Sequence, residues 1–251
     1  MSKKKLNIRN KLYGLLLFNL IWYFVAGLVD SPVLIGPVAT YVNMFNIMPS
    51  MWSHLTVSLE RIVVGLLISI LAGAAIGIVM ARSPKVNSML SPLVYFTYPV
   101  PKLALLPVVM LLTGIGEISK IIMIILIVIF QVIISTRDAV NNIPKDNYNV
   151  LISLGAGKMQ QFREITFPAI LPDLFTTLRI ALGIAVSVLF FTETYGTDRG
   201  MGYYIVDAWM RINYLDMYAG IALLSIMGFL LFLLIDLADT VCCKWNKAIS
   251  V

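Results

Sequence analysis

Apolar side chains run through most of this chain in long segments. Residues 62–81 carry no charged residue over 20 positions, and residues 217–235 carry none over 19. An α-helix of about 20 apolar residues crosses the hydrocarbon core of a bilayer, so segments of this length predict membrane spans. Applied along the chain, this criterion predicts an all-α membrane protein with six transmembrane helices. Their approximate bounds are 12–29, 55–81, 89–112, 118–136, 173–195 and 216–242.

The third of these segments is interrupted by four prolines, Pro92, Pro99, Pro101 and Pro107. Proline removes a backbone donor and disturbs a helix. Broken helices at membrane depth are tolerated where they are buried in protein or line a cavity. We therefore predict that Tyr98, Pro99 and Pro101 border a passage through the membrane, with a purely structural kink as the alternative.

The segment before the second span, residues 30–54, has a helical pattern of its own. Val38, Tyr41, Val42 and Phe45 recur at i, i+3, i+4 and i+7, which places them on one face of a helix. This pattern predicts a short amphipathic helix that lies in the outer membrane interface.

Charged residues make up 13% of the chain and hydrophobic residues 59%, whereas a soluble domain has about 25% charged residues. Thirteen of the 19 Lys and Arg residues fall in the N-terminal segment, around Arg82, in residues 137–172 and near the C-terminus. The segments expected on the other side of the membrane are 30–54, 113–117 and 196–215, and they hold only Arg199 and Arg211. The positive-inside rule therefore predicts that both termini are cytoplasmic. Because the net charge of +6 is spread along the membrane surface, we expect no nucleic-acid partner.

The longest polar interruption is the cytoplasmic loop 137–172. Pro144 suits the first turn of a helix, in which Tyr148, Leu151 and Ile152 share one face. Gly155 can end this helix in a left-handed conformation. The pattern predicts a short helix that presents an apolar face to a soluble partner. An ordinary connecting loop packed on its own helices is the alternative.

A second short helix is predicted over residues 157–166, with Met159, Phe162 and Ile165 three positions apart. Pro168 is expected to stop it, because the residue before a proline avoids the α region. Asp173 is then a candidate N-cap for the fifth span.

This loop resembles the cytoplasmic coupling loop in permease subunits of bacterial ABC importers. The family motif reads E-A-A, three residues, Gly, nine residues, I-x-L-P. Gly155 takes the place of the motif glycine, and residues 165–168 match I-x-L-P with Phe for Leu. Asn149, Val150 and Leu151 replace the E-A-A triplet. Residues 54–65, 99–120, 178–183 and 200–205, together with Glu193, resemble the nitrate/sulfonate/taurine group of these permeases.

The resemblance implies a type I ABC importer permease fold in a single transmembrane domain, residues 1–251, of the cytoplasmic membrane. It implies a second permease copy, two cytoplasmic ABC ATPase subunits that hold ATP and Mg²⁺, and an extracytoplasmic substrate-binding protein. The cargo would be a small anion of the nitrate/sulfonate/taurine type or a vitamin precursor. The residues that would couple to the ATPase are Tyr148, Leu151, Ile152, Gly155, Ala156, Lys158, Phe162 and Pro168.

We expect no ATP site in this chain and no enzyme activity of its own. GAGK (155–158) ends in a lysine, but a P-loop needs a glycine at position 152 and Ser or Thr at position 159. Ile152 and Met159 stand there instead. We also expect no cofactor and no metal, because Cys242 and Cys243 are adjacent and His54 is the one histidine. The two cysteines are free thiols or lipidation sites.

Several features leave two interpretations open. Glu193, near the outer end of the fifth span, is either a residue of the transport pathway or half of an ion pair with Arg199 or Arg61. Glu117 and Lys120 are expected to form a pair at the start of a helix on the external face, with docking of a binding protein as the alternative. The small residues Gly73 and Gly77 allow close helix approach, either inside the helix bundle or between two copies of the chain.

Two other classes of protein share part of these features. A secondary transporter driven by an ion gradient often has inverted repeats and paired broken helices, and the sequence contains neither a repeat nor a second broken segment. A structural subunit of a membrane complex would not require the polar loop 137–172.

Overall fold

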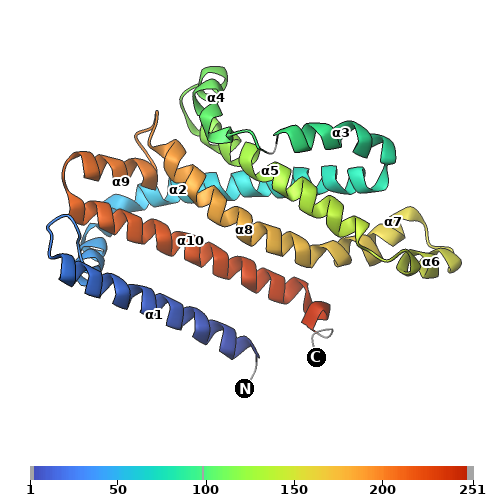
Figure 1. The fold of residues 1–251 in the computed structure, drawn as a ribbon, viewed down its shortest axis with the longest axis horizontal. Helices are drawn as coiled ribbons and strands as arrows, with labels where there is room; N and C mark the ends of the chain where they lie inside the picture. Colours follow the sequence, from blue (N-terminus) through green and yellow to red (C-terminus); the bar gives the residue numbers. More distant parts are fainter. Residues whose placement is uncertain (1–2, 98, 248–251) are drawn as a thin grey trace. The chain divides into compact units, whose positions relative to one another are not determined.

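The computed structural model describes residues 3–97 and 99–247, which form helices and connecting turns without a β-strand (Figure 1). The elements are α1 (Lys3–Val29), α2 (Pro37–Arg82), α3 (Pro84–Thr97), η1 (Lys102–Leu105), α4 (Leu106–Thr113), α5 (Glu117–Asn141), α6 (Lys145–Ser153), α7 (Lys158–Gln161), the π turn η2 (Phe162–Thr166), α8 (Phe167–Glu193), α9 (Met201–Met210), α10 (Tyr214–Cys242) and η3 (Lys244–Lys247).

The contacts within the chain define two compact units. Unit 1 contains the chain up to Val57 and residues Asp198–Ile226, and unit 2 contains Ser58–Thr197 and the chain from Met227. The helices α2 and α10 each contribute one part to each unit. Unit 1 therefore holds α1 and α9, whereas α3 to α8 belong to unit 2.

Four helices in the described residues are long and apolar enough to cross a membrane: α2, α5, the continuous helix Lys158–Glu193, and α10. They cover nearly all of four predicted spans, 55–81, 118–136, 173–195 and 216–242. The α3 and η1–α4 segments, which are bent by 88°, make a fifth span if they are counted together. In α1, Tyr13–Val29 is a shorter apolar helix. The count of six and the orientation of the termini stay predictions.

The prediction of a separate short helix within residues 30–54 is wrong, because α2 begins at Pro37 and continues to Arg82. The helical pattern around Phe45 is confirmed. The one stop signal that follows it is Pro49, and this proline lies inside α2 without ending it. At 1.5 Å per residue the 46 residues of α2 extend about 69 Å, more than twice the roughly 30 Å of hydrocarbon. A large part of α2 must therefore lie outside the hydrocarbon core.

The third predicted span, 89–112, is broken as its prolines indicated. Helix α3 ends at Thr97, and Pro99 and Pro101 lie in the connection to η1. Pro107 stands in the first turn of α4, where a missing N–H costs little. Tyr98, a predicted pathway residue, lies outside the described residues.

The predicted stop at Pro168 is wrong. The π turn joins α7 to α8, and the N–H of Phe167 reaches back five residues to the carbonyl of Phe162. A proline in a regular α-helix crowds the carbonyl four residues earlier. We attribute the uninterrupted helix to this wider turn, which changes the register just before Pro168. Asp173 consequently lies inside α8 and is not an N-cap.

Unit 2 is built around close contact between α2 and α5. A Cβ atom on Gly73 would lie 2.8 Å from Val132 Cβ, and one on Gly77 would lie 2.7 Å from the Ile133 carbonyl oxygen. Only a hydrogen at these positions allows the two backbones to approach so closely. The small residues of α2 thus serve packing inside this chain, the first of the two alternatives.

Unit 1 is held by aromatic and polar contacts among α1, α2 and α10. The indole N–H of Trp22 donates to the carbonyl of Ile35 at 3.0 Å, and its ring stacks on Tyr218 with centroids 6.0 Å apart. The hydroxyl of Tyr41 donates to the amide oxygen of Asn19 at 2.8 Å. These contacts fix α1 against the N-terminal part of α2.

The glycine contact between α2 and α5 gives a stability prediction. Gly77→Ala places a methyl group against backbone atoms that cannot rotate away, and such overpacking costs about 1–3 kcal/mol. We expect a midpoint of thermal unfolding several degrees lower for the purified protein in detergent. Gly228→Ala is the matched control, because its Cβ would meet Val186 at an ordinary 3.6 Å. Equal midpoints for Gly77→Ala and wild type would refute the close contact.

Candidate coupling loop and buried charge cluster

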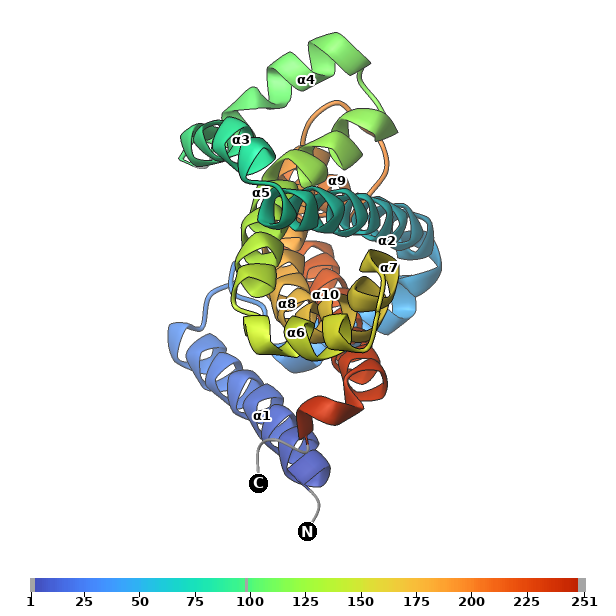
Figure 2. The same ribbon diagram turned by 90° about the vertical axis from the view of Figure 1, so that its right-hand side faces the viewer.

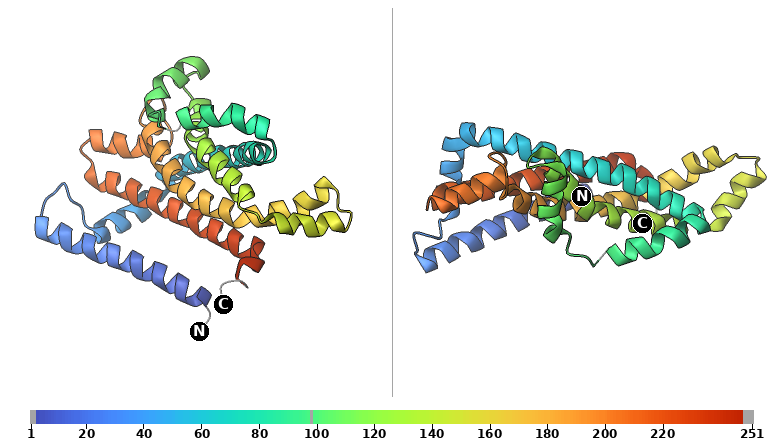
Figure 3. Two further views of the ribbon diagram at one scale, coloured as in Figure 1. Left: turned by 45° about the vertical axis from the view of Figure 1, so that its right-hand side comes forward. Right: turned by 90° about the horizontal axis from the view of Figure 1, so that it is seen from above.

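The loop 137–172 lies at one end of unit 2, where α6 and α7 connect α5 to α8 (Figure 1). Figure 2 looks at this end and shows both short helices in front of α5 and α8. Both also extend away from the longer helices of unit 2 in the right-hand view of Figure 3. A soluble partner could therefore reach them without entering the helix bundle.

Gly155 ends α6 in the left-handed conformation, with φ 79°, as the sequence predicted. Its N–H donates to the carbonyl of Ile152 at 2.9 Å, and the N–H of Ala156 donates to the carbonyl of Leu151 at 3.0 Å. These two bonds form a Schellman motif, which satisfies the last carbonyls of the helix. The amide of Gln161 also donates to the carbonyl of Ala156 at 3.0 Å. The turn between α6 and α7 is therefore held by hydrogen bonds on both sides of Gly155.

The buried hydroxyl of Thr166 connects the π turn to α2 and to α6. Thr166, in the π turn, is fully buried and accepts a hydrogen bond from Arg82 at the end of α2. It shares a second hydrogen bond with the hydroxyl of Tyr148 in α6 at 3.0 Å. The guanidinium of Arg82 lies 5.4 Å from the centroid of the Tyr148 ring. We call these three residues the Thr166 junction.

Sequence reasoning missed two members of this junction. Thr166 occupies the variable position of the I-x-L-P motif, and Arg82 counted only as a cation for the orientation of the membrane helices. A short polar residue between two large apolar ones was the available signal for Thr166. The position of Arg82 at the end of a span gave no indication of its partner.

The side chains of α6 and α7 divide into an inner and an outer set. Tyr148 and Leu151 are half-buried against the chain itself. Lys158 and a group of large apolar residues are exposed to solvent. We call the apolar group the exposed apolar surface of the loop; its members and exposed fractions are Val150 (62%), Ile152 (54%), Leu154 (78%) and Met159 (77%). Of the apolar face predicted for α6, only Ile152 belongs to it.

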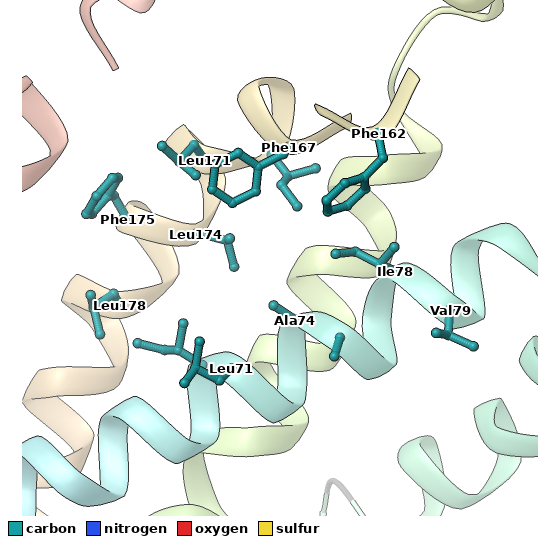
Figure 4. Close-up of a pocket in the computed structure, with 13 residues that line it drawn as sticks. Leu71, Ala74, Ile78, Val79, Phe162, Phe167, Leu171, Leu174, Phe175 and Leu178 are labelled. Atoms are coloured by element: carbon teal, nitrogen blue, oxygen red, sulfur yellow. The ribbon is translucent and has the colours of Figure 1, made fainter. Parts of the chain in front are cut away.

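Phe162 faces its own chain. It lines an apolar groove of about 570 Å³ between α2 and α8, together with Phe167, Ile78 and Leu174 (Figure 4). The ring centroids of Phe162 and Phe167 lie 6.2 Å apart. Both aromatic rings thus line the groove that α2 borders, and Phe162 belongs to the same π turn as Thr166. Pro168, the last of the predicted coupling residues, is half-buried in the following turn.

A second group of functional candidates lies at the other end of unit 2. Arg61 of α2, only 1% exposed, donates to Glu193 of α8 at 2.7 Å and to both oxygens of Glu117 of α5 at 2.5 and 2.6 Å. Ser58 donates to the Glu193 carboxylate at 2.8 and 2.9 Å. Lys120 is fully buried and donates to the carbonyl oxygen of Gly196 at 2.9 Å.

These residues form the buried charge cluster, which Glu117 joins from an exposed position, with 58% of its side chain accessible. Glu193 has Arg61 as its ion-pair partner. Glu117 and Lys120 both lie at the start of α5. Glu117 accepts hydrogen bonds from Arg61, and Lys120 donates one to the carbonyl oxygen of Gly196. Removing one member of a buried ion pair costs about 3–5 kcal/mol, because the other charge stays buried. The cluster therefore fixes α2, α5 and α8 to one another, while a pathway role for Glu193 stays a prediction.

The remaining polar candidates are simpler. The His54 ring stacks on Tyr203 with centroids 5.9 Å apart. Within residues 3–97 and 99–247, no three His, Cys, Asp or Glu side chains are grouped so that they could hold a metal ion. Cys242 is exposed and Cys243 is buried.

The helical fold, the apolar spans and the projecting loop define the transmembrane subunit of a transporter. The sequence profile of binding-protein-dependent transport system inner membrane components matches residues 65–242, and the chain belongs to this family. It is a permease subunit of an ABC importer and a multi-pass protein of the cytoplasmic membrane.

Known relatives agree with this assignment. The chain is 34% identical to the taurine transport system permease protein TauC of Escherichia coli (strain K12), over 84% of this chain and 80% of TauC. It is 30% identical to the putative aliphatic sulfonates transport permease protein SsuC of Bacillus subtilis (strain 168), over 91% of this chain and 84% of SsuC. A chain of the bacterial alginate ABC transporter has a similar fold, with a TM-score of 0.66, 17% identity, and coverage of 96% of this chain and 98% of that one.

The buried charge cluster gives the second prediction. Arg61→Met and Glu193→Gln should each destabilise the protein by about 3–5 kcal/mol, and the double variant should cost less than the sum by about 1–3 kcal/mol. Unfolding of the purified protein in detergent measures all three. Asp207→Asn, which breaks the exposed Arg211–Asp207 pair, is the control and should cost under about 1 kcal/mol. Additive losses in the double variant would show that Arg61 and Glu193 do not interact.

The two cysteines give the third prediction. Burial and a hydrogen bond to Asp239 raise the pKa of the Cys243 thiol to about 11. Because the reactive thiolate is scarce below that pKa, we expect a maleimide at pH 7 to label Cys242 alone. Cys242→Ser should abolish labelling at pH 7, and Cys243→Ser should leave it unchanged, as measured by mass spectrometry. Labelling of Cys243 at the rate of Cys242 would contradict its burial.

Proposed function

We propose that two copies of this chain form the translocation pathway of an ATP-driven importer for small organic sulfonates or related oxyanions. Two ABC ATPase subunits would bind the loop 137–172 and hold ATP and Mg²⁺, and an extracytoplasmic binding protein would deliver the cargo. The relatives support this cargo class, since they include permeases named for taurine, aliphatic sulfonates and nitrate. A vitamin precursor is the second candidate, because the chain is also 27% identical to the formylaminopyrimidine transport permease protein ThiX of Halalkalibacterium halodurans.

The observation that carries the proposal is the exposed apolar surface of the loop. Large apolar side chains that are exposed outside a membrane mark a site for a protein partner. Recognition of a short helix commonly places such side chains in a groove of the partner. Leu154 and Met159, on the two sides of Gly155, are each more than three-quarters exposed. We infer that they enter a groove of the ATPase, and that Lys158 lies at its edge.

The Thr166 junction explains how movement of the ATPase would reach the membrane helices. Tyr148 connects α6 to Thr166, and Thr166 connects to α2 through Arg82 and to α8 through the π turn. A displaced α6 would therefore pull on two spanning helices at once. Coupling of this kind requires an element with two states that both sites influence. We propose that this element is the loop together with the ends of α2 and α8.

The rival class, a secondary transporter, makes a different prediction for the purified system. The test is uptake of labelled sulfonate into proteoliposomes that contain the permease and its ATPase, with binding protein added. We expect uptake that depends on ATP and on the binding protein. Uptake driven by a proton or sodium gradient without ATP would overturn the proposal.

The fourth prediction concerns the exposed apolar surface. Leu154→Asp and Met159→Asp should lower the ATPase activity stimulated by binding protein at least tenfold, because a buried apolar side chain contributes about 1.5–3 kcal/mol and a buried charge adds a further cost. Both side chains are exposed in the isolated chain, so its thermal midpoint should not change.

Asn147→Asp is the matched control, because it adds the same charge at an exposed polar position of α6. It should keep the stimulated activity. Full stimulation in the Leu154 and Met159 variants would show that the ATPase binds elsewhere.

A further inference from the structure

A lysine stands at the break between α3 and α4. Lys102 begins η1, in a segment whose neighbours are apolar. Its ammonium lies 5.3 Å from the centroid of the Phe130 ring in α5. Phe130 is close to the middle of α5, which runs from Glu117 to Asn141. If α5 crosses the bilayer, the ammonium lies near the centre of the membrane rather than at its surface.

The same ammonium borders a pocket of about 500 Å³ in unit 2. Val100 and Lys102 line it from the helix break, Ile127 from the middle of α5, and Gly183 and Ser187 from the middle of α8. A Cβ atom on Gly183 would meet nothing within 4 Å, so this side of α8 is open. Ser187, one turn later, is also small. Two small residues of α8 thus leave space beside a positive charge.

The position of Lys102 at membrane depth, beside a helix break and a pocket, points to a role in function. A lysine at the centre of a membrane helix costs about 2.5–3.5 kcal/mol on insertion scales. A cation–π contact returns about 0.5–2 kcal/mol. Ionisable residues at this depth usually face a water-filled cavity or a functional site, and broken helices usually line one.

We propose that Lys102 binds the anionic group of the cargo in this pocket as the cargo crosses the membrane. The ligand class is a small sulfonate or a similar oxyanion, and the pocket volume lies in the range of small-molecule sites. The inference rests on the proposed function for its cargo class. It adds a second selection step, in the permease, after selection by the binding protein. Lys102 would favour anions over neutral compounds of the same size.

The first test measures binding at the pocket without transport. Ser187→Cys is introduced in the assembled transporter with Cys242→Ser and Cys243→Ser, in nanodiscs, and its labelling by N-ethylmaleimide is timed. Ethanesulfonate should slow labelling severalfold, and the neutral ethyl methyl sulfone should not. The protection should disappear in Lys102→Met and persist in Lys102→Arg. Ser225→Cys, at an exposed position of α10, is the control whose labelling ethanesulfonate should leave unchanged.

Two outcomes would overturn the inference: equal labelling with and without ethanesulfonate, or protection that persists in Lys102→Met. A structural role of Lys102 predicts a different pattern. If the lysine only holds η1 on α5, Lys102→Met and Phe130→Leu should lower the thermal midpoint equally, and neither should change protection at position 187 in the folded protein.

The second test measures import of sulfonate per ATP hydrolysed in proteoliposomes. Lys102→Met should lower this ratio at least tenfold, and Lys102→Arg should keep most of it. The two tests separate the two proposals. Protection at position 187 without ATPase stimulation by sulfonate-loaded binding protein would refute the proposed function and keep the site. Stimulation and import without protection would refute the site and keep the function.

Discussion

The close approach of α2 to α5 is the constraint on which unit 2 depends. Gly73 and Gly77 allow it, because no side chain larger than hydrogen fits between the two backbones. The same helix carries Arg61 on one side of this contact and Arg82 on the other. Arg61 fixes α8 through the buried carboxylate of Glu193 and α5 through the exposed carboxylate of Glu117, and Arg82 fixes the loop through Thr166. The part of α2 in unit 2 is therefore a rigid element, and a force applied near Arg82 would be carried along it toward Arg61.

The loop 137–172 illustrates what a single sequence predicts well. Gly155 was recognised because a left-handed residue at a helix end has few alternatives, and its φ of 79° agrees. The inner and outer faces of α6 were harder to assign. Helical periodicity groups Tyr148 with Leu151 and Ile152, but it does not say whether the group meets a partner or the chain itself. That choice depends on Thr166 and Arg82, which lie 18 and 66 residues from Tyr148.

The other errors have the same origin. Pro168 is a reliable stop signal in a regular helix, but the π turn over Phe162–Thr166 precedes it and the helix continues through it. The extent of α2 was underestimated because the amphipathic segment before the second span continues the same helix, with Pro49 inside it. Local patterns thus identified the apolar spans, whereas long-range contacts decided where the helices begin, end and face.

The loop also departs from the permease motif at a position that matters for binding. Asn149 stands where the motif has an acidic residue, and its amide donates to Asp146 of the same helix at 3.5 Å. An uncharged side chain cannot form the salt bridge that a carboxylate would offer to the ATPase. The proposed contact must then depend more on Leu154 and Met159, whose burial needs no complementary charge. Apolar contacts of this kind are also less sensitive to salt than an ion pair at the same place.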